Sequence, residues 1–113
     1  MNKREVLIVK YVADLKDKFD IDADKELLTK ITIGLGPSIY NADSSTVSSS
    51  DEKEIATVRN KFLIGKLGLD DNEALDEGIS KVIESYGRTN RSKYRAVVYY
   101  LLVKHFKREA VYS

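Results

Sequence analysis

The segment GLGPSIYNAD, residues 34–43, contains residue types that can bind an anion. Glycines let main-chain N–H groups converge on a negative group, and hydroxyl and amide side chains can add further donors. The segment lacks the GK[ST] ending of a P-loop and the third glycine of a dinucleotide-binding turn. A helix end followed by a turn is the simpler explanation of its Gly-Pro pair. The candidate ligand residues are Gly34, Gly36, Ser38, Tyr40, Asn41 and Asp43.

Positive charge is concentrated near the C-terminus. Residues 88–113 carry a net charge of +6, whereas residues 1–87 carry −5. Basic side chains with interleaved tyrosines can bind phosphates and stack on bases, which suggests a nucleic-acid surface. However, these residues fall at the two ends of a predicted helix, so a solvated surface facing the acidic remainder of the domain is the simpler interpretation. The candidate basic surface comprises Arg88, Arg91, Lys93, Arg95, Lys104, Lys107 and Arg108.

Seven tyrosines in the chain suggest a protein interface, because tyrosine tolerates an apolar contact beside a wet hydroxyl. The candidate interface residues are Tyr94, Tyr99 and Tyr100. Tyr99 and Tyr100 are adjacent, so one helix face does not easily bury both. We therefore expect one of them to contact a neighbouring helix and the other a partner subunit; the simpler alternative is that both are half-buried in the chain itself.

Two other patterns suggest chemistry only weakly. Asp20, Asp22 and Asp24 match the first three ligand positions of an EF-hand, but Lys25 replaces its turn glycine and Ile31 its bidentate glutamate. A helix cap is the simpler interpretation. His105 can titrate, but no nucleophile or orienting carboxylate lies nearby in the sequence. We expect a partly buried packing residue there.

Composition limits the possible functions further. The absence of cysteine excludes disulfides, thiolate metal sites and thiol catalysis, and the single histidine excludes a two-histidine metal site within one chain. No catalytic residues, metal ligands or cofactor motif are recognised, so an enzyme is the least supported class. The longest apolar run, residues 96–103, is far shorter than the roughly 20 residues of a membrane span. We expect a cytoplasmic protein.

Apolar periodicity predicts five helices, over residues 3–19, 23–35, 50–67, 70–86 and 91–107. Asp22, Ser49, Asp70 and Asn90 are the predicted N-caps. The run AVVYYLLV also suits a strand, but its length and the preceding cap favour a central helix. Residues 38–50 are rich in serine and predict a long loop. The 113 residues therefore predict one domain, residues 1–113, that folds as a compact all-α bundle.

The strings GLGPSIYNAD, KFLIGKLGL and NRSKYRAVVYYLLVKHF resemble a small bacterial family known only as a domain of unknown function. The resemblance spans residues 5–110. It implies a soluble helical domain of about 100 residues, and it assigns no activity, cofactor or catalytic residue.

The leading hypothesis is a non-enzymatic helical module that acts through protein–protein contact and self-association. One alternative is a small nucleic-acid-binding protein that uses the basic C-terminal helix. The other is a protein that binds a small ligand or anion at residues 34–43.

Overall fold

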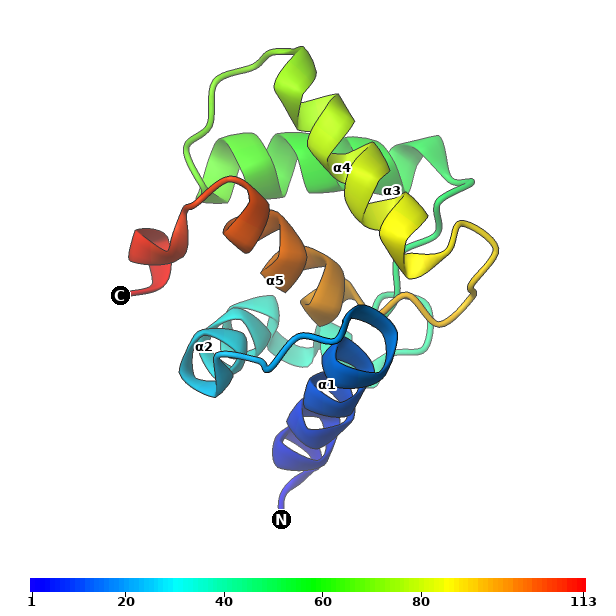
Figure 1. Ribbon diagram of the computed structural model, residues 1–113, viewed down its shortest axis with the longest axis vertical. Coiled ribbons are helices and arrows are strands. Elements are labelled where there is room, and N and C mark those ends of the chain that lie inside the picture. Colours follow the sequence, from blue (N-terminus) through cyan, green and yellow to red (C-terminus); the bar gives the residue numbers. More distant parts are fainter.

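The helices of this chain surround one central helix, α5 (Arg95–His105) (Figure 1). The structure is a computed structural model that describes all residues, 1–113. Helix α5 packs against α1 (Lys3–Phe19), α2 (Lys25–Leu35) and α4 (Glu73–Tyr86). Helix α3 (Glu52–Thr57) continues directly into a π-helix, η2 (Val58–Lys66), which packs on α4. Two short 3-10 helices complete the chain, η1 (Gly36–Tyr40) and η3 (Glu109–Tyr112). The predicted all-α bundle of five helices is confirmed.

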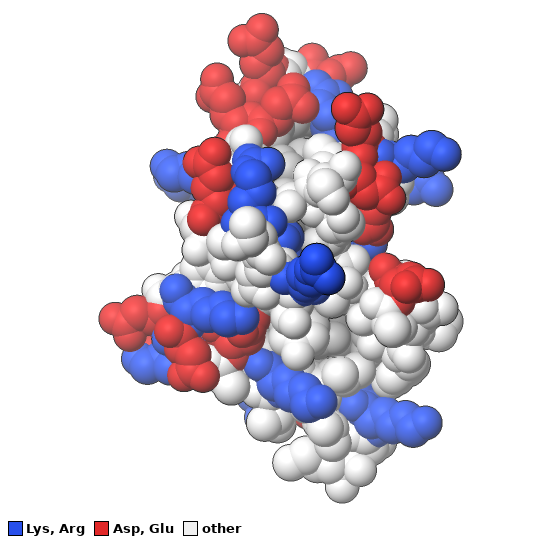
Figure 2. All heavy atoms as spheres, turned by 90° about the vertical axis from the view of Figure 1, so that its right-hand side faces the viewer, with Lys and Arg blue, Asp and Glu red and all other residues white.

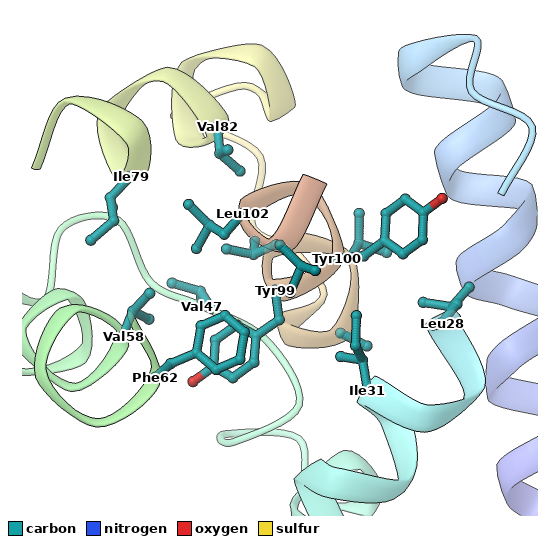
Figure 3. Packing of buried hydrophobic residues seen from close by; sticks show 14 of the residues in the cluster. Leu28, Ile31, Val47, Val58, Phe62, Ile79, Val82, Tyr99, Tyr100 and Leu102 are labelled. Atoms are coloured by element: carbon teal, nitrogen blue, oxygen red, sulfur yellow. The ribbon is translucent and has the colours of Figure 1, made fainter. Parts of the chain in front are cut away.

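Helix α5 is central because it is apolar around most of its circumference. Leu28 and Ile31 of α2 pack on one side of it, and residues of η2 and α4 pack on the other (Figure 3). This burial on several sides confirms the prediction of a central helix and excludes the strand alternative. None of the helices is long and apolar enough to cross a membrane. The buried residues of α5 are Arg95, Ala96, Val97, Val98, Tyr99, Tyr100, Leu102 and Val103.

The helix starts differ from the predicted ones. The N-caps of three helices lie two residues after the predicted ones: the side chains of Asp24, Asp51 and Asn72 accept the free N–H groups of the first turn. Helix α5 begins at Arg95, four residues late, and it has no side-chain cap. The cause is tertiary: Tyr94 is held in an antiparallel β-bridge with Thr46, so the chain is extended up to that point.

The third predicted helix changes its winding where the sequence reads VRNKFLIGK. In the π-helix η2 each N–H bonds a carbonyl five residues back, as from Leu67 to Phe62 at 2.9 Å. The wider turn directs Val58, Phe62 and Leu67 into the core, at a spacing of four to five residues. Glycine suits this turn, because a Cβ at Gly65 would lie 3.3 Å from the Asn60 carbonyl oxygen.

Candidate functional site

The Gly34–Asp43 segment is not a single open loop. Gly34 lies inside α2, and Gly36 ends that helix with a φ of +64°. The Ser38 hydroxyl donates to the Leu35 carbonyl at 2.8 Å, and the Asn41 side chain accepts from the Asp43 N–H at 2.9 Å. The Ser38 and Asn41 side chains therefore hydrogen-bond to the main chain of the same segment, and the anion site at residues 34–43 stays a prediction.

Asp20, Asp22 and Asp24 do not act together. Asp20 ends α1 in the left-handed conformation, and Asp20 and Asp22 form ion pairs with Lys16 at 3.1 and 3.4 Å. Asp24 caps α2 instead. His105 is exposed, with its ring edge-on to Phe106, rather than partly buried as expected.

The structure corrects the tyrosine interface. Tyr99 and Tyr100 are both buried within the chain, on opposite sides of α5 (Figure 3). The Tyr99 ring stacks on Phe62 with centroids 3.7 Å apart, and the Tyr100 hydroxyl accepts the Asp24 N–H at 2.9 Å. Tyr94 is half-buried against Tyr11. This cluster is part of the core, so it does not present a surface to a partner.

The seven candidate basic residues also separate. Arg95 is buried: its guanidinium donates to the Ser44 and Thr46 carbonyl oxygens and forms an ion pair with Glu54. Lys104 lies near the other end of α5, an 11-residue helix about 16 Å long, with Lys107 and Arg108 beyond it. The chain therefore has no continuous basic stripe. The remaining three residues are Arg88, Arg91 and Lys93, and these line one cleft.

This cleft, which we call the cationic cleft, lies between the Ser-rich loop and the segment that joins α4 to α5. Its volume is about 670 Å³. Both segments run along the right-hand side of Figure 1, and this side faces the viewer in Figure 2. Acidic side chains gather at the upper end of Figure 2, where α4 begins. Its lining residues are Thr46, Val47, Ser48, Ser49, Ser50, Arg88, Thr89, Asn90, Arg91 and Lys93.

Two backbone hydrogen bonds hold the walls of the cleft together. The Val47 N–H donates to the Lys93 carbonyl, and the Arg95 N–H donates to the Ser45 carbonyl, each at 2.8 Å. The Val47 side chain is buried in the core and anchors the Ser-rich loop. The Ser49 hydroxyl donates across the cleft to the Arg88 carbonyl at 2.9 Å. The Ser-rich loop is therefore fixed at several points along its length.

The opposite wall is shaped by its own turn residues. Gly87 ends α4 with a φ of +100°, a conformation that side chains rarely adopt. Asn90 then accepts the Ser92 N–H at 2.8 Å in an Asx turn. This turn places Arg88, Arg91 and Lys93 along the cleft.

Lys93 is the least expected residue of the site. It is only 3% exposed, and no carboxylate lies within ion-pair distance of its ammonium group. Its Nζ donates to the carbonyl oxygens of Arg88 and Asn90, which uses two of its three N–H donors. Burial, and secondarily the nearby charge of Arg88, lower the pKa of Lys93. Lys93 therefore combines a buried cation, one N–H donor not used by these hydrogen bonds and a place in the lining of the cleft.

The other charges around the cleft leave this excess uncompensated. Arg91 forms no ion pair. Arg88 forms one with Glu84, but this pair is weak because its atoms are 3.6 Å apart and both side chains are exposed. Glu54 is close by, but its carboxylate already accepts from Arg95 and from the Ser48 N–H. Because no acidic residue lines the cleft, it carries net positive charge.

The sequence alone does not predict the cationic cleft as a unit. The sequence predicts Arg88, Arg91 and Lys93 as part of a basic surface around the C-terminal helix, and residues 38–50 as a loop. Nothing in the local sequence signals that the two segments meet, because their contact depends on how α3, η2 and α4 fold back. The Ser-rich composition of one segment and the basic charge of the other were the available signals.

The fold and the cleft together define a small all-α domain with a polar, cationic pocket. The chain belongs to the family described as "Protein of unknown function (DUF2853)", whose model matches residues 10–110. This match confirms the predicted resemblance to a domain of unknown function. The chain matches no curated protein.

Proposed function

We propose that this protein is a non-enzymatic binding module that takes up a phosphate or similar oxyanion in the cationic cleft. The observation that carries the proposal is Lys93, a buried ammonium group without a carboxylate partner that faces a cleft wide enough for a small molecule. A bound oxyanion would supply the missing counter-charge and accept a hydrogen bond from the third N–H of Lys93. The cytoplasmic location expected from the sequence remains part of this proposal.

Hydroxyl groups on the other wall of the cleft add neutral donors for an oxyanion. The hydroxyls of Ser48 and Ser50 lie 3.2 Å apart and can rotate to donate into the cleft. Arg91 is exposed and free to form the paired hydrogen bonds that guanidinium groups make with phosphate. The site thus offers three cations and several neutral donors.

Replacing Lys93 with methionine is expected to weaken phosphate binding at least about tenfold, because it removes the buried charge while nearly preserving side-chain length. The measurement is a titration of the protein with inorganic phosphate and with sulfate. Binding is monitored by calorimetry and by the NMR chemical shifts of the amides of residues 46–50 and 88–93. The matched control is Lys61→Met, which removes an exposed lysine outside the cleft. Unchanged shifts in the wild type, or equal shifts in both variants, would contradict the proposal.

A second candidate function, association with a protein partner, is supported by a different surface. Met1, Val6, Leu7, Ile39 and Tyr40 line an apolar groove of about 400 Å³ between α1 and η1, and Tyr40 is 52% exposed. Lys3 also lines the groove and forms no ion pair. A partner segment that combines apolar with acidic residues would complement this groove.

Changing Val6 to aspartate is expected to disrupt that association while leaving the fold intact, because the side chain is 43% exposed. Native mass and affinity for a synthetic acidic amphipathic helix are the measurements, with Ala13→Asp on the same helix as the control. A monomeric wild type without affinity for the peptide would remove this candidate.

A further inference from the structure

We infer, on the basis of the proposed function, that the ligand of the cationic cleft carries two phosphate groups within one compact, polar, non-aromatic molecule. Such a ligand is either inorganic diphosphate or a polyol that bears two phosphates. The inference follows from the number of charges, the room available and the chemistry of the lining.

The charge of the cleft exceeds that of one phosphate group. Arg88, Arg91 and Lys93 contribute three positive charges to the lining. The one carboxylate paired with any of them is Glu84, which lies outside the lining and reaches Arg88 at 3.6 Å between two exposed side chains. A single phosphate monoester carries about 1.5 to 2 negative charges near neutral pH, so it leaves the cleft cationic. Two linked phosphate groups match three cations more closely.

The room also exceeds the need of one phosphate. A volume of about 670 Å³ falls within the range of small-molecule pockets, roughly 300–1,000 Å³. The three cations come from different points of the turn, at residues 88, 91 and 93, rather than from one end of it. One phosphate at Lys93 would therefore leave part of the cationic wall without an anion.

The lining is unsuitable for an aromatic or alkyl group. Val47 is the one hydrophobic residue among the ten that line the cleft, and its side chain is committed to the core. No aromatic residue lines the cleft, and the adjacent Tyr94 ring packs on Tyr11 at 5.2 Å. Proteins that bind single-stranded nucleic acids stack bases on aromatic side chains, and the cleft offers none. A body rich in hydroxyl groups fits donors and acceptors such as Thr46, Thr89 and Asn90.

The test compares the affinities of four probes at fixed ionic strength: inorganic phosphate, inorganic diphosphate, fructose 1,6-bisphosphate and adenosine diphosphate. We expect either diphosphate or the hexose bisphosphate to bind at least about tenfold more tightly than phosphate. Comparing these two probes identifies which kind of ligand the cleft prefers. Adenosine diphosphate should bind no more tightly than diphosphate. Affinity should fall as salt concentration rises.

Two variants locate the second phosphate. Arg91→Met is expected to reduce the preference for diphosphate over phosphate several-fold, whereas Lys93→Met lowers the affinity for both. The control is Arg108→Met, an exposed arginine outside the cleft, and it should change neither value.

The outcomes distinguish failure of the two-phosphate inference from failure of the proposed anion site. Equal affinities for phosphate and diphosphate would overturn the two-phosphate inference while the proposed anion site survives. Tighter binding of adenosine diphosphate than of diphosphate, by tenfold or more, would show recognition of an aromatic body and would also overturn it. Absence of binding by all four probes would overturn the proposed function itself.

Discussion

Replacing Arg95 with methionine is expected to lower the free energy of unfolding by about 3 kcal/mol. The Arg95 residue is 8% exposed, and it binds the Glu54 carboxylate, the Tyr99 hydroxyl and the carbonyl oxygens of Ser44 and Thr46. Methionine can fill much of the space but replaces none of these donors. The partly buried Glu54 would then lose its counter-charge, which is the costly result of breaking such a pair.

Urea denaturation of the two proteins, followed by circular dichroism, measures this loss. For a chain of this size the loss corresponds to a fall of roughly 12 °C in the melting temperature. Arg91→Met is the matched control, because Arg91 is exposed and unpaired, and it should change stability by less than about 0.5 kcal/mol. A loss of similar size in both variants would contradict the role given to Arg95.

Stability is also expected to fall as the pH rises from 10 to 12. Burial, and secondarily the neighbouring Tyr94 and Tyr40, raise the pKa of Tyr11 to about 12. Burial likewise raises the pKa of Tyr112 to about 12, and burial with the hydrogen bond to Asp14 raises the pKa of Tyr86. Below pH 10 both the folded and the unfolded chain keep these protons.

Above pH 10 the unfolded chain releases these protons while the folded chain still holds them, so ionisation favours unfolding. For the fully buried Tyr11 the difference of two pKa units corresponds to about 2.7 kcal/mol, lost as the pH passes through 12. Unfolding free energies measured between pH 8 and 12 test this slope. A flat profile across that range would contradict it.

Tyr11→Phe separates the hydroxyl from the ring. The Tyr11 hydroxyl is buried without a hydrogen-bond partner. Its removal is therefore expected to raise stability by about 1 kcal/mol at pH 7 and to reduce the alkaline loss. Tyr40→Phe, at an exposed position, is the control for the hydroxyl and should leave stability at pH 7 unchanged. A less stable Tyr11→Phe protein at pH 7 would show that the hydroxyl is satisfied in solution.

The helices were predictable because apolar residues recur along the sequence at helical spacing, and α1 even ends at Phe19 as expected. The local winding of η2 was not, because a π-helix and an α-helix share most of their sequence preferences. The burial of both Tyr99 and Tyr100 was also missed. Adjacent residues point to different sides of a helix, and only the assembled fold places Phe62 on one side of α5 and α2 on the other.

The candidate site was predictable only in part. Its cations were recognised by their charge, but Arg95 and Arg91 look alike in the sequence, and tertiary contacts alone decide that one pairs with Glu54 while the other stays free. Likewise, nothing in the sequence of the Ser-rich loop indicates that its Val47 N–H donates to the Lys93 carbonyl. Long-range pairing of this kind has no local pattern.

The β-bridge between Thr46 and Tyr94 also divides the chain. Residues 47–93, which include α3, η2 and α4, leave and rejoin the rest of the molecule at the same point, so they form a closed loop with a single neck. The cationic cleft lies at that neck, and its two walls are the two ends of the loop. An anion bound to both walls would therefore link the two ends of the loop reversibly. It would add to the free energy of unfolding an increment that grows with the logarithm of the free anion concentration above its Kd, and it would restrain the segment from α3 to α4 where that segment joins the rest of the fold.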